Sequence, residues 1–170
     1  MLKKFFDISD LNDIDLRDII LGKKLNNDLH NKNIGLLYEK PSTRTRLSFN
    51  VGINQLGGKG IDIKFDDLNF SRQESLEDTL RAFGCYLDGL IFRTTEHKKL
   101  FLAHELMGKP VINALSEKSH PCQTLADLIT LYEKFKKLDL KISWFGDLNN
   151  VLFSLVEAAN LLEHLQINIF

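Results

Sequence analysis

The stretch from Asn33 to Phe65, NIGLLYEKPSTRTRLSFNVGINQLGGKGIDIKF, decides the fold of this chain. It opens with an apolar run of strand length over residues 33–39. Residues 43–56 then place apolar side chains at the i, i+4 and i+7 spacing of one helix face, and the glycines at 57–58 are typical of a helix end. Residues 61–65 alternate apolar and polar side chains, as a strand with one buried face does. The stretch therefore predicts a strand, a helix and a second strand, the unit from which parallel sheets are built.

The same alternation runs through the rest of the chain. Further helices are predicted over 9–28, 74–84, 96–107, 121–137 and 149–163, and further strands over 87–92, 110–115, 141–145 and 166–170. Ser9 is a possible N-cap for the first of these helices, and Ser71 with Glu74 fits a capping box for the second. Alternating strands and helices predict an α/β fold, with a doubly wound, mostly parallel sheet and helices on both faces.

A second unit of the same kind is predicted to start near residue 139. Residues 1–138 supply the elements of a complete sheet and a long closing helix, whereas residues 139–170 supply a strand, a helix and the opening of another strand. We therefore expect one α/β domain over 1–138 and the truncated start of a second, Rossmann-like α/β domain over 139–170.

The composition narrows the classes of partner. The chain has 170 residues, 44% hydrophobic and 26% charged, and a formal net charge of −1, so an anion site must come from a local cluster. Two cysteines, Cys85 and Cys122, supply neither a disulfide framework nor a metal-ligand set. Asp7 follows too few apolar residues for a signal peptide, and no run reaches membrane-spanning length. We expect a cytoplasmic protein with no nucleic-acid or membrane partner and no bound metal.

The connection between the first strand and its helix, Glu39 to Arg46, predicts an anion site. The amide groups and dipole of a helix start favour an anion, and the hydroxyls of Ser42, Thr43 and Thr45 add donors. Arg44 can bind a phosphate through two parallel hydrogen bonds. The alternative is that one hydroxyl only caps the helix and the arginines are solvated.

Three further segments follow strands at the same predicted sheet edge. His120 and Gln123, in the sequence SHPCQ, could polarise a carbonyl and accept from an NH₂ group, or could serve only as capping residues. Arg93 could add charge to the anion site or lie on the surface. The asparagines of Asp147-Leu148-Asn149-Asn150 could cap a helix or hold a polar substrate. Cys122 has no base placed for it and is expected to pack.

Together these segments resemble the carbamoyltransferase family, which contains aspartate and ornithine enzymes. The run Ser-Thr-Arg-Thr-Arg at 42–46 resembles the family's carbamoyl-phosphate loop. His-Pro-Cys-Gln at 120–123 resembles the ornithine branch, because aspartate enzymes usually carry Thr in place of Cys122. The paired asparagines at 149–150, followed by Ser154-Leu155, resemble the same branch, and the likeness covers all 170 residues. Leu148 departs from the branch, which commonly has glycine there.

The resemblance implies a role for each motif residue. Ser42, Thr43, Arg44 and Thr45 would hold the phosphate of carbamoyl phosphate, and Arg46 would be more structural. Arg93 would contact phosphate and carbonyl oxygen, His120 the carbonyl oxygen, Gln123 the carbamoyl NH₂, and Asn150 the α-amino-acid end of ornithine. Arg72 would reach from a neighbouring subunit of a homotrimer. Residues 1–138 would form the carbamoyl-phosphate-binding domain and 139–170 the start of the ornithine-binding domain.

The implied reaction is carbamoyl transfer to the δ-amine of L-ornithine, giving L-citrulline and phosphate in arginine metabolism. Arg93, His120 and Thr45 would stabilise the tetrahedral oxyanion, and no metal or cofactor would be needed. The family's distal half, with a His-Cys-Leu-Pro segment and further ornithine contacts, is absent from these 170 residues, so we expect the chain alone to be inactive. The alternatives are another amine acceptor (aspartate, putrescine or an acylated ornithine) or a non-catalytic module that binds carbamoyl phosphate.

Overall fold

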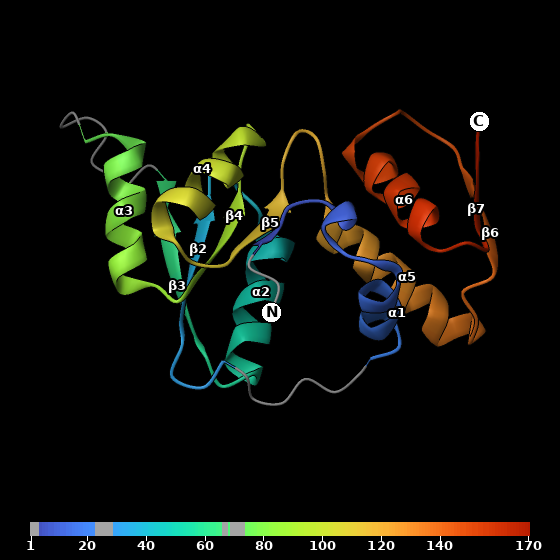
Figure 1. Cartoon of the computed structure of the whole chain (residues 1–170), viewed down its shortest axis with the longest axis horizontal. Helices are drawn as coiled ribbons and strands as arrows, with labels where there is room; N and C mark the ends of the chain where they lie inside the picture. Colours follow the sequence, from blue (N-terminus) through green and yellow to red (C-terminus); the bar gives the residue numbers. More distant parts are fainter. Residues whose placement is uncertain (1–3, 23–28, 66–67, 69–73) are drawn as a thin grey trace.

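The computed structural model describes residues 4–22, 29–65, 68 and 74–170. Its strands form one larger and one smaller sheet, which lie at opposite ends of the long axis (Figure 1). The first sheet contains β1 (Lys4–Phe5), β2 (Asn33–Tyr38), β3 (Lys59–Lys64), β4 (Gly89–Arg93) and β5 (Val111–Leu115). The second contains β6 (Leu140–Trp144) and β7 (Leu165–Ile169).

The five-stranded sheet is parallel throughout, in the order β1-β5-β4-β2-β3. From β2 the chain moves outward to β3 and then returns to the other side of β2 to form β4. The order of strands therefore reverses between β2 and β4, and ligands of open α/β sheets bind at such a switch point, beyond the carboxyl ends of the strands. The predicted α/β fold class is confirmed.

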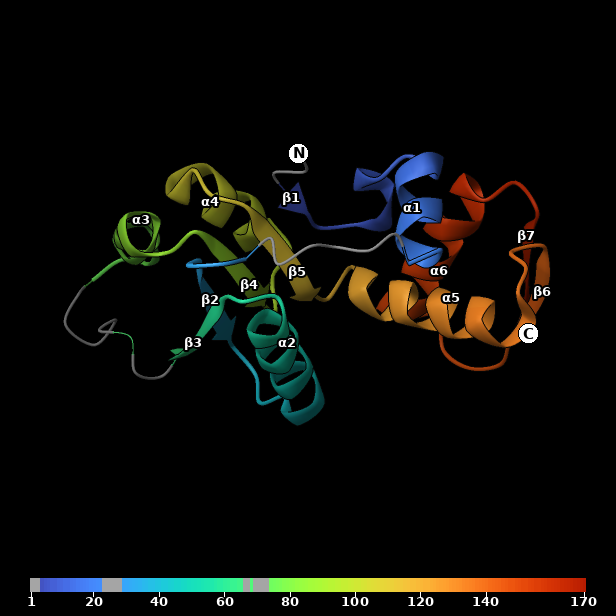
Figure 2. The ribbon, with the colours of Figure 1, turned by 90° about the horizontal axis from the view of Figure 1, so that it is seen from below.

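Helices cover both faces of this sheet (Figure 2). The helical elements of the described residues are η1 (Ile8–Asp10, a 3₁₀ turn), α1 (Asp13–Ile20), α2 (Thr43–Gln55), α3 (Leu76–Tyr86), α4 (Lys98–Met107), α5 (Pro121–Phe135) and α6 (Asn150–Leu161). Of these, α2 covers one face of the large sheet and α3 and α4 the other, whereas α6 packs on β7 and η1. Leu36 and Leu37, adjacent in β2, point to opposite faces: Leu36 joins a cluster with Ile53 of α2, and Leu37 a cluster with Leu80 of α3 and Leu100 of α4. None of the described helices is long and apolar enough to cross a bilayer.

A third apolar cluster joins the two ends of the chain. Ile8, Leu16 and Ile20 pack with Leu128 of α5 and Leu155 of α6. The N-terminal segment therefore shares its core with the β6-α6-β7 unit, which lies beside it in both views (Figures 1 and 2). The domain boundary at residues 138–139 remains a prediction.

The structure corrects two predicted helix starts and one helix length. The helix predicted over 9–28 ends at Ile20 and is capped by Asn12, not Ser9, because the Asn12 side chain accepts from the Asp15 amide at 2.8 Å. Helix α3 is capped by Ser75, which accepts from the Asp78 amide at 3.1 Å. Ser71, the predicted cap, lies outside the described residues. The two-residue strand β1 was not predicted, because two residues show no periodicity.

Helices α3 and α4 approach closely at Gly84. A Cβ atom added there would lie 2.6 Å from the carbonyl oxygen of Met107. A Cβ atom added at Gly52 in α2 would meet nothing within 4 Å. The same substitution should therefore change stability in opposite directions at the two sites.

We expect Gly84→Ala to lower the free energy of unfolding by about 1–3 kcal/mol, because the backbone of Met107 must shift. Gly52→Ala should raise it by about 0.5–1 kcal/mol, because alanine loses less backbone entropy in a helix than glycine does. Urea unfolding followed by circular dichroism measures both values. Equal effects of the two substitutions would contradict the close packing of α3 on α4.

Candidate functional site

A cavity of about 800 Å³ lies beyond the carboxyl ends of β2, β4 and β5, where the strand order predicts a ligand site. It is lined from the N-terminal half of α2, from Arg93 at the end of β4, and from the first turns of α5. Seven predicted site residues line it together: Ser42, Thr43, Arg44, Thr45, Arg93, His120 and Gln123.

The start of α2 forms one wall of the cavity. Ser42 occupies the N-cap position but makes no side-chain capping bond. Its hydroxyl oxygen instead accepts from Nη1 of Arg93 at 3.1 Å. The first-turn amides of a helix have no carbonyl partner within it, and the helix dipole favours an anion there. The Ser42 side chain therefore does not act as the cap of α2.

His120 lies half-buried at the start of α5 and faces the same space. Burial lowers the pKa of His120 below its ordinary value, and the positive charge of Arg93 lowers it further. At neutral pH the imidazole is therefore uncharged and has one N–H to donate. Its Nδ1 atom is buried and has no hydrogen-bond partner among the residues that the structure describes.

The two residues that follow in α5 differ in their chemistry. The side-chain amide nitrogen of Gln123 donates to Asp127 at 2.9 Å, and the side-chain oxygen, which can only accept, has no partner among the described residues. The thiol of Cys122 donates to the carbonyl oxygen of Asn113 at 3.4 Å. Burial raises the pKa of Cys122 to about 12, so the thiolate that a nucleophile needs is disfavoured.

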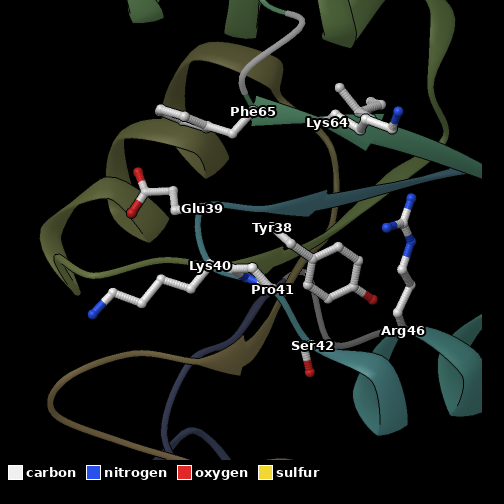
Figure 3. A pocket seen from close by; sticks show the side chains of 9 residues that line it. Tyr38, Glu39, Lys40, Pro41, Ser42, Arg46, Lys64 and Phe65 are labelled. Atoms are coloured by element: carbon white, nitrogen blue, oxygen red, sulfur yellow. The ribbon is translucent and has the colours of Figure 1, made fainter.

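Arg46 turns away from this cavity. Its Nε atom lies 2.8 Å from the Asp62 carboxylate of β3, and it lines a separate cavity of about 210 Å³ at the carboxyl ends of β2 and β3. In Figure 3 the guanidinium extends toward β3, beside Tyr38, while the Ser42 hydroxyl points away from it. The geometry agrees with a structural role for Arg46.

The paired asparagines have separate tasks. Asn149 caps α6, because its side-chain oxygen accepts from the amides of Val151 and Leu152. Asn150 donates from Nδ2 to the carbonyl oxygen of Ser116 at 2.7 Å and lines a smaller cavity of about 130 Å³ that Arg93 also lines. Arg72 lies outside the described residues.

Glu39, directly after β2, was not among the predicted site residues. Its carboxylate accepts from Lys99 Nζ at 2.8 Å, from the Thr95 amide at 2.6 Å and from the Thr94 hydroxyl at 2.9 Å. Burial alone would raise the pKa of Glu39, but these hydrogen bonds outweigh burial and lower it. Glu39 thereby joins the end of β2 to the segment that follows Arg93. No local sequence pattern indicates the ion pair between Glu39 and Lys99, because Lys99 lies 60 positions further along the chain.

No group of three or more histidine, cysteine, aspartate or glutamate side chains is arranged to hold a metal ion within residues 4–22, 29–65, 68 and 74–170.

Comparison with known proteins identifies relatives of the whole chain. The family described as "Aspartate/ornithine carbamoyltransferase, carbamoyl-P binding domain" matches residues 3–133. An ornithine carbamoyltransferase of Methanocorpusculum labreanum is 42% identical, and the match covers 94% of this chain and 56% of the relative. The chain therefore spans about half the length of the curated relatives it matches.

Two solved structures are similar to this chain over nearly its whole length. The ornithine carbamoyltransferase of Thermus thermophilus superposes with a TM-score of 0.90 at 32% identity, covering 99% of this chain and 61% of that one. The ornithine carbamoyltransferase of Gloeobacter violaceus superposes with a TM-score of 0.86 at 38% identity, covering 98% of this chain and 57% of that one.

The proximity of Arg93 and His120 can be tested by titration. We expect the imidazole of His120 to titrate with a midpoint below the ordinary value of 6.5. Arg93→Ala should raise this midpoint, because one of the two causes of the lowered pKa is removed while burial remains. Nuclear magnetic resonance of the histidine side chains measures it. Arg81→Ala on α3 serves as a control and should change nothing; an unchanged midpoint in Arg93→Ala would contradict the geometry.

Proposed function

Because the chain belongs to the aspartate/ornithine carbamoyltransferase family through its carbamoyl-phosphate-binding domain, we propose that the 800 Å³ cavity binds carbamoyl phosphate. The observation that carries the proposal is the convergence of seven donor and acceptor residues from three segments on this one cavity. They combine a helix start, two arginines, three hydroxyls, a neutral imidazole and an amide. Such a set matches a ligand with a phosphate at one end and a carbamoyl group at the other.

In the proposed complex the phosphate lies at the start of α2, where Ser42, Thr43, Arg44 and Thr45 bind it. Arg93, already hydrogen-bonded to Ser42, contacts both the phosphate and the carbonyl oxygen. The neutral His120 donates to the carbonyl oxygen. Gln123, whose nitrogen is held by Asp127, accepts from the carbamoyl NH₂ through its oxygen.

We further propose that the acceptor is the δ-amine of L-ornithine. The neutral amine attacks the carbonyl carbon, the bond to the phosphate oxygen breaks, one amine proton passes to the leaving phosphate, and L-citrulline and phosphate form. Arg93, His120 and Thr45 stabilise the charge that develops on the carbonyl oxygen. Support for ornithine comes from the names of the 38–46% identical relatives and from Asn150, which lines the adjoining cavity that Arg93 also lines.

The assembly that we propose is a homotrimer in which Arg72 of one subunit serves the neighbouring site. A contact that repeats round a threefold axis joins different surfaces of adjacent subunits. Helix α2, beside the site, exposes the apolar side chains of Leu47 (61% exposed) and Val51 (51% exposed) one turn apart. Burial of these side chains between subunits would stabilise such a contact.

Binding of carbamoyl phosphate to the chain tests the site. Arg44→Ala should weaken binding by about 1.5–3 kcal/mol, because a charge-assisted hydrogen bond at the helix start is lost. Lys137→Ala removes an exposed charge that does not line the cavity and should leave the affinity unchanged. Isothermal titration calorimetry compares the two variants. Equal affinities of the two variants would contradict the proposal that the Ser42–Arg46 segment binds carbamoyl phosphate.

A measurement of citrulline formation tests carbamoyl transfer separately from the binding of carbamoyl phosphate. The chain carries one of the proposed ornithine contacts, so we expect it to form no citrulline at rates typical of enzymes, about 1–10³ per second. Citrulline formation at such a rate from purified chain would overturn this expectation. If aspartate, putrescine or an acylated ornithine is carbamoylated instead, the proposed acceptor is wrong although the site is right.

Shared sites predict complementation between two inactive variants of a protein that joins this chain to a complete ornithine-binding half. Arg44→Ala and Arg72→Ala chains, mixed after dissociation and reassociation, should regain activity, because some sites draw one intact arginine from each chain. Each variant alone should stay nearly inactive, and the mass from sedimentation should be that of three chains. A mixture that shows only the sum of the separate activities would place Arg72 outside the neighbouring site.

A further inference from the structure

Ser154, on the second turn of α6, reaches the segment that carries His120. The Ser154 side chain is buried, and its hydroxyl oxygen accepts from the backbone amide of His120 at 2.9 Å. The same oxygen lies 3.0 Å from the hydroxyl of Ser119. Helix α6 packs between the small sheet and the N-terminal segment, and Ser154 does not line the 800 Å³ cavity.

Every hydrogen-bonding position of the Ser154 hydroxyl is used. Its single proton goes to the carbonyl oxygen of Asn150, one turn earlier in α6, at 3.0 Å. Ser154 must therefore accept from both remaining partners, so the Ser119 hydroxyl is the donor in their contact. A buried hydroxyl with one bond donated and two accepted holds its partners in one arrangement.

The segment 116–119 is also held from the side of β1 and α4. His97 Nδ1 lies 2.8 Å from the hydroxyl of Ser116, and His97 Nε2 lies 3.3 Å from the Asp7 carboxylate. This order of side chains resembles a hydrolytic triad. Ser116 is fully buried, however, and its oxygen also accepts from the Ser119 amide and from Asn113, so no substrate can reach it. The cluster is a support for the turn.

The ring of His120 has no comparable support of its own. Its Nδ1 atom has no partner within the part of the chain that the structure describes, whereas the His120 backbone amide is held by the Ser154 hydroxyl. Pro121 follows at once and restricts the backbone of His120 further. The bond from the His120 amide to Ser154 joins α6 directly to the residue that carries the imidazole.

We propose that Ser154 is a positioning residue for His120, placing the imidazole against the carbamoyl end of the ligand from outside the binding cavity. This inference rests on the proposed binding of carbamoyl phosphate. It assigns to the β6-α6-β7 unit a part in the carbamoyl-phosphate site, because a shift of α6 moves the amide of His120. Asn150, which donates to the Ser116 carbonyl, ties the other end of the same segment to α6.

Two ligands separate positioning from general stability. In the proposed complex carbamoyl phosphate contacts His120 as well as Arg93 and the start of α2, whereas inorganic phosphate contacts only Arg93 and the start of α2. Ser154→Ala should weaken binding of carbamoyl phosphate about tenfold, the order of one misplaced hydrogen bond. It should change the affinity for phosphate by less than about twofold, as expected for a distant site. Calorimetric titration of the chain with each ligand gives both numbers.

Thr79→Val on α3 is the matched control. Thr79 is likewise buried, and its hydroxyl lies 2.9 Å from the Glu74 carboxylate and 3.1 Å from the carbonyl oxygen of Ser75, one turn earlier, but it does not line the cavity. Its loss should lower stability without changing the preference for carbamoyl phosphate over phosphate. Ser154→Thr, which keeps the hydroxyl, should restore that preference.

Three outcomes decide between the proposals. If the unmodified chain does not prefer carbamoyl phosphate to phosphate, the proposed function fails and this inference fails with it. If the chain has the preference and Ser154→Ala retains it in full, only the role of Ser154 fails. Hydrogen exchange of the unmodified chain decides even if Ser154→Ala does not fold: the His120 amide should be protected, and exchange at the rate of an exposed amide overturns the inference.

Discussion

The parallel pairing of β2 with β4 is the constraint on which the rest of the site depends. It places Tyr38 opposite Arg93, and the amide of Glu39 then donates to the carbonyl oxygen of Arg93 at 3.0 Å. Because both strands end together, the helix start that follows one strand meets the guanidinium that ends the other. The buried Glu39 carboxylate keeps the two ends together by binding Lys99, Thr94 and Thr95. A slip of one residue in this pairing would turn Arg93 to the opposite face of the sheet.

The electrostatics of the molecule are local. A chain of net charge −1 has no long-range attraction for an anion, yet Arg44, Arg93 and the start of α2 face one cavity. Other cations form ion pairs with nearby carboxylates: Arg46 with Asp62, Lys118 with Asp7, and Lys99 with Glu39. The pKa of Asp7 illustrates the balance, since burial raises it while His97 and Lys118 bring it down to about 2. Among the described residues, Arg44 and Arg93 have no ion pair of this kind, so the positive charge that faces the cavity comes from these two side chains and the start of α2.

Much of this could be predicted from the sequence, because the information was local. Each βα junction carries its own periodicity and its own polar residues, and parallel strands bring their carboxyl ends to one edge. What could not be predicted depends on contacts between distant segments. Nothing near Glu39 indicates Lys99, and nothing near His120 indicates Ser154, 34 positions later in another helix. The end of α1 was also beyond reach, because the apolar pattern continues past Ile20 whereas the helix does not. The division of labour between Asn149 and Asn150 followed from geometry alone.

The apolar cluster that joins the two ends of the chain has a consequence for biosynthesis. Ile8, Leu16 and Ile20 leave the ribosome first, but their partners in α5 and α6 follow only after roughly a hundred further residues. Translation adds about 5–20 residues per second, so the surface that buries these side chains is synthesised about 5–20 s later. The edge strand β1 can pair only after β5 has been made, because β5 is its one neighbour in the sheet. During that interval the apolar face of α1 lacks its partners in α5 and α6, and the His120 amide lacks the Ser154 hydroxyl until α6 has been made.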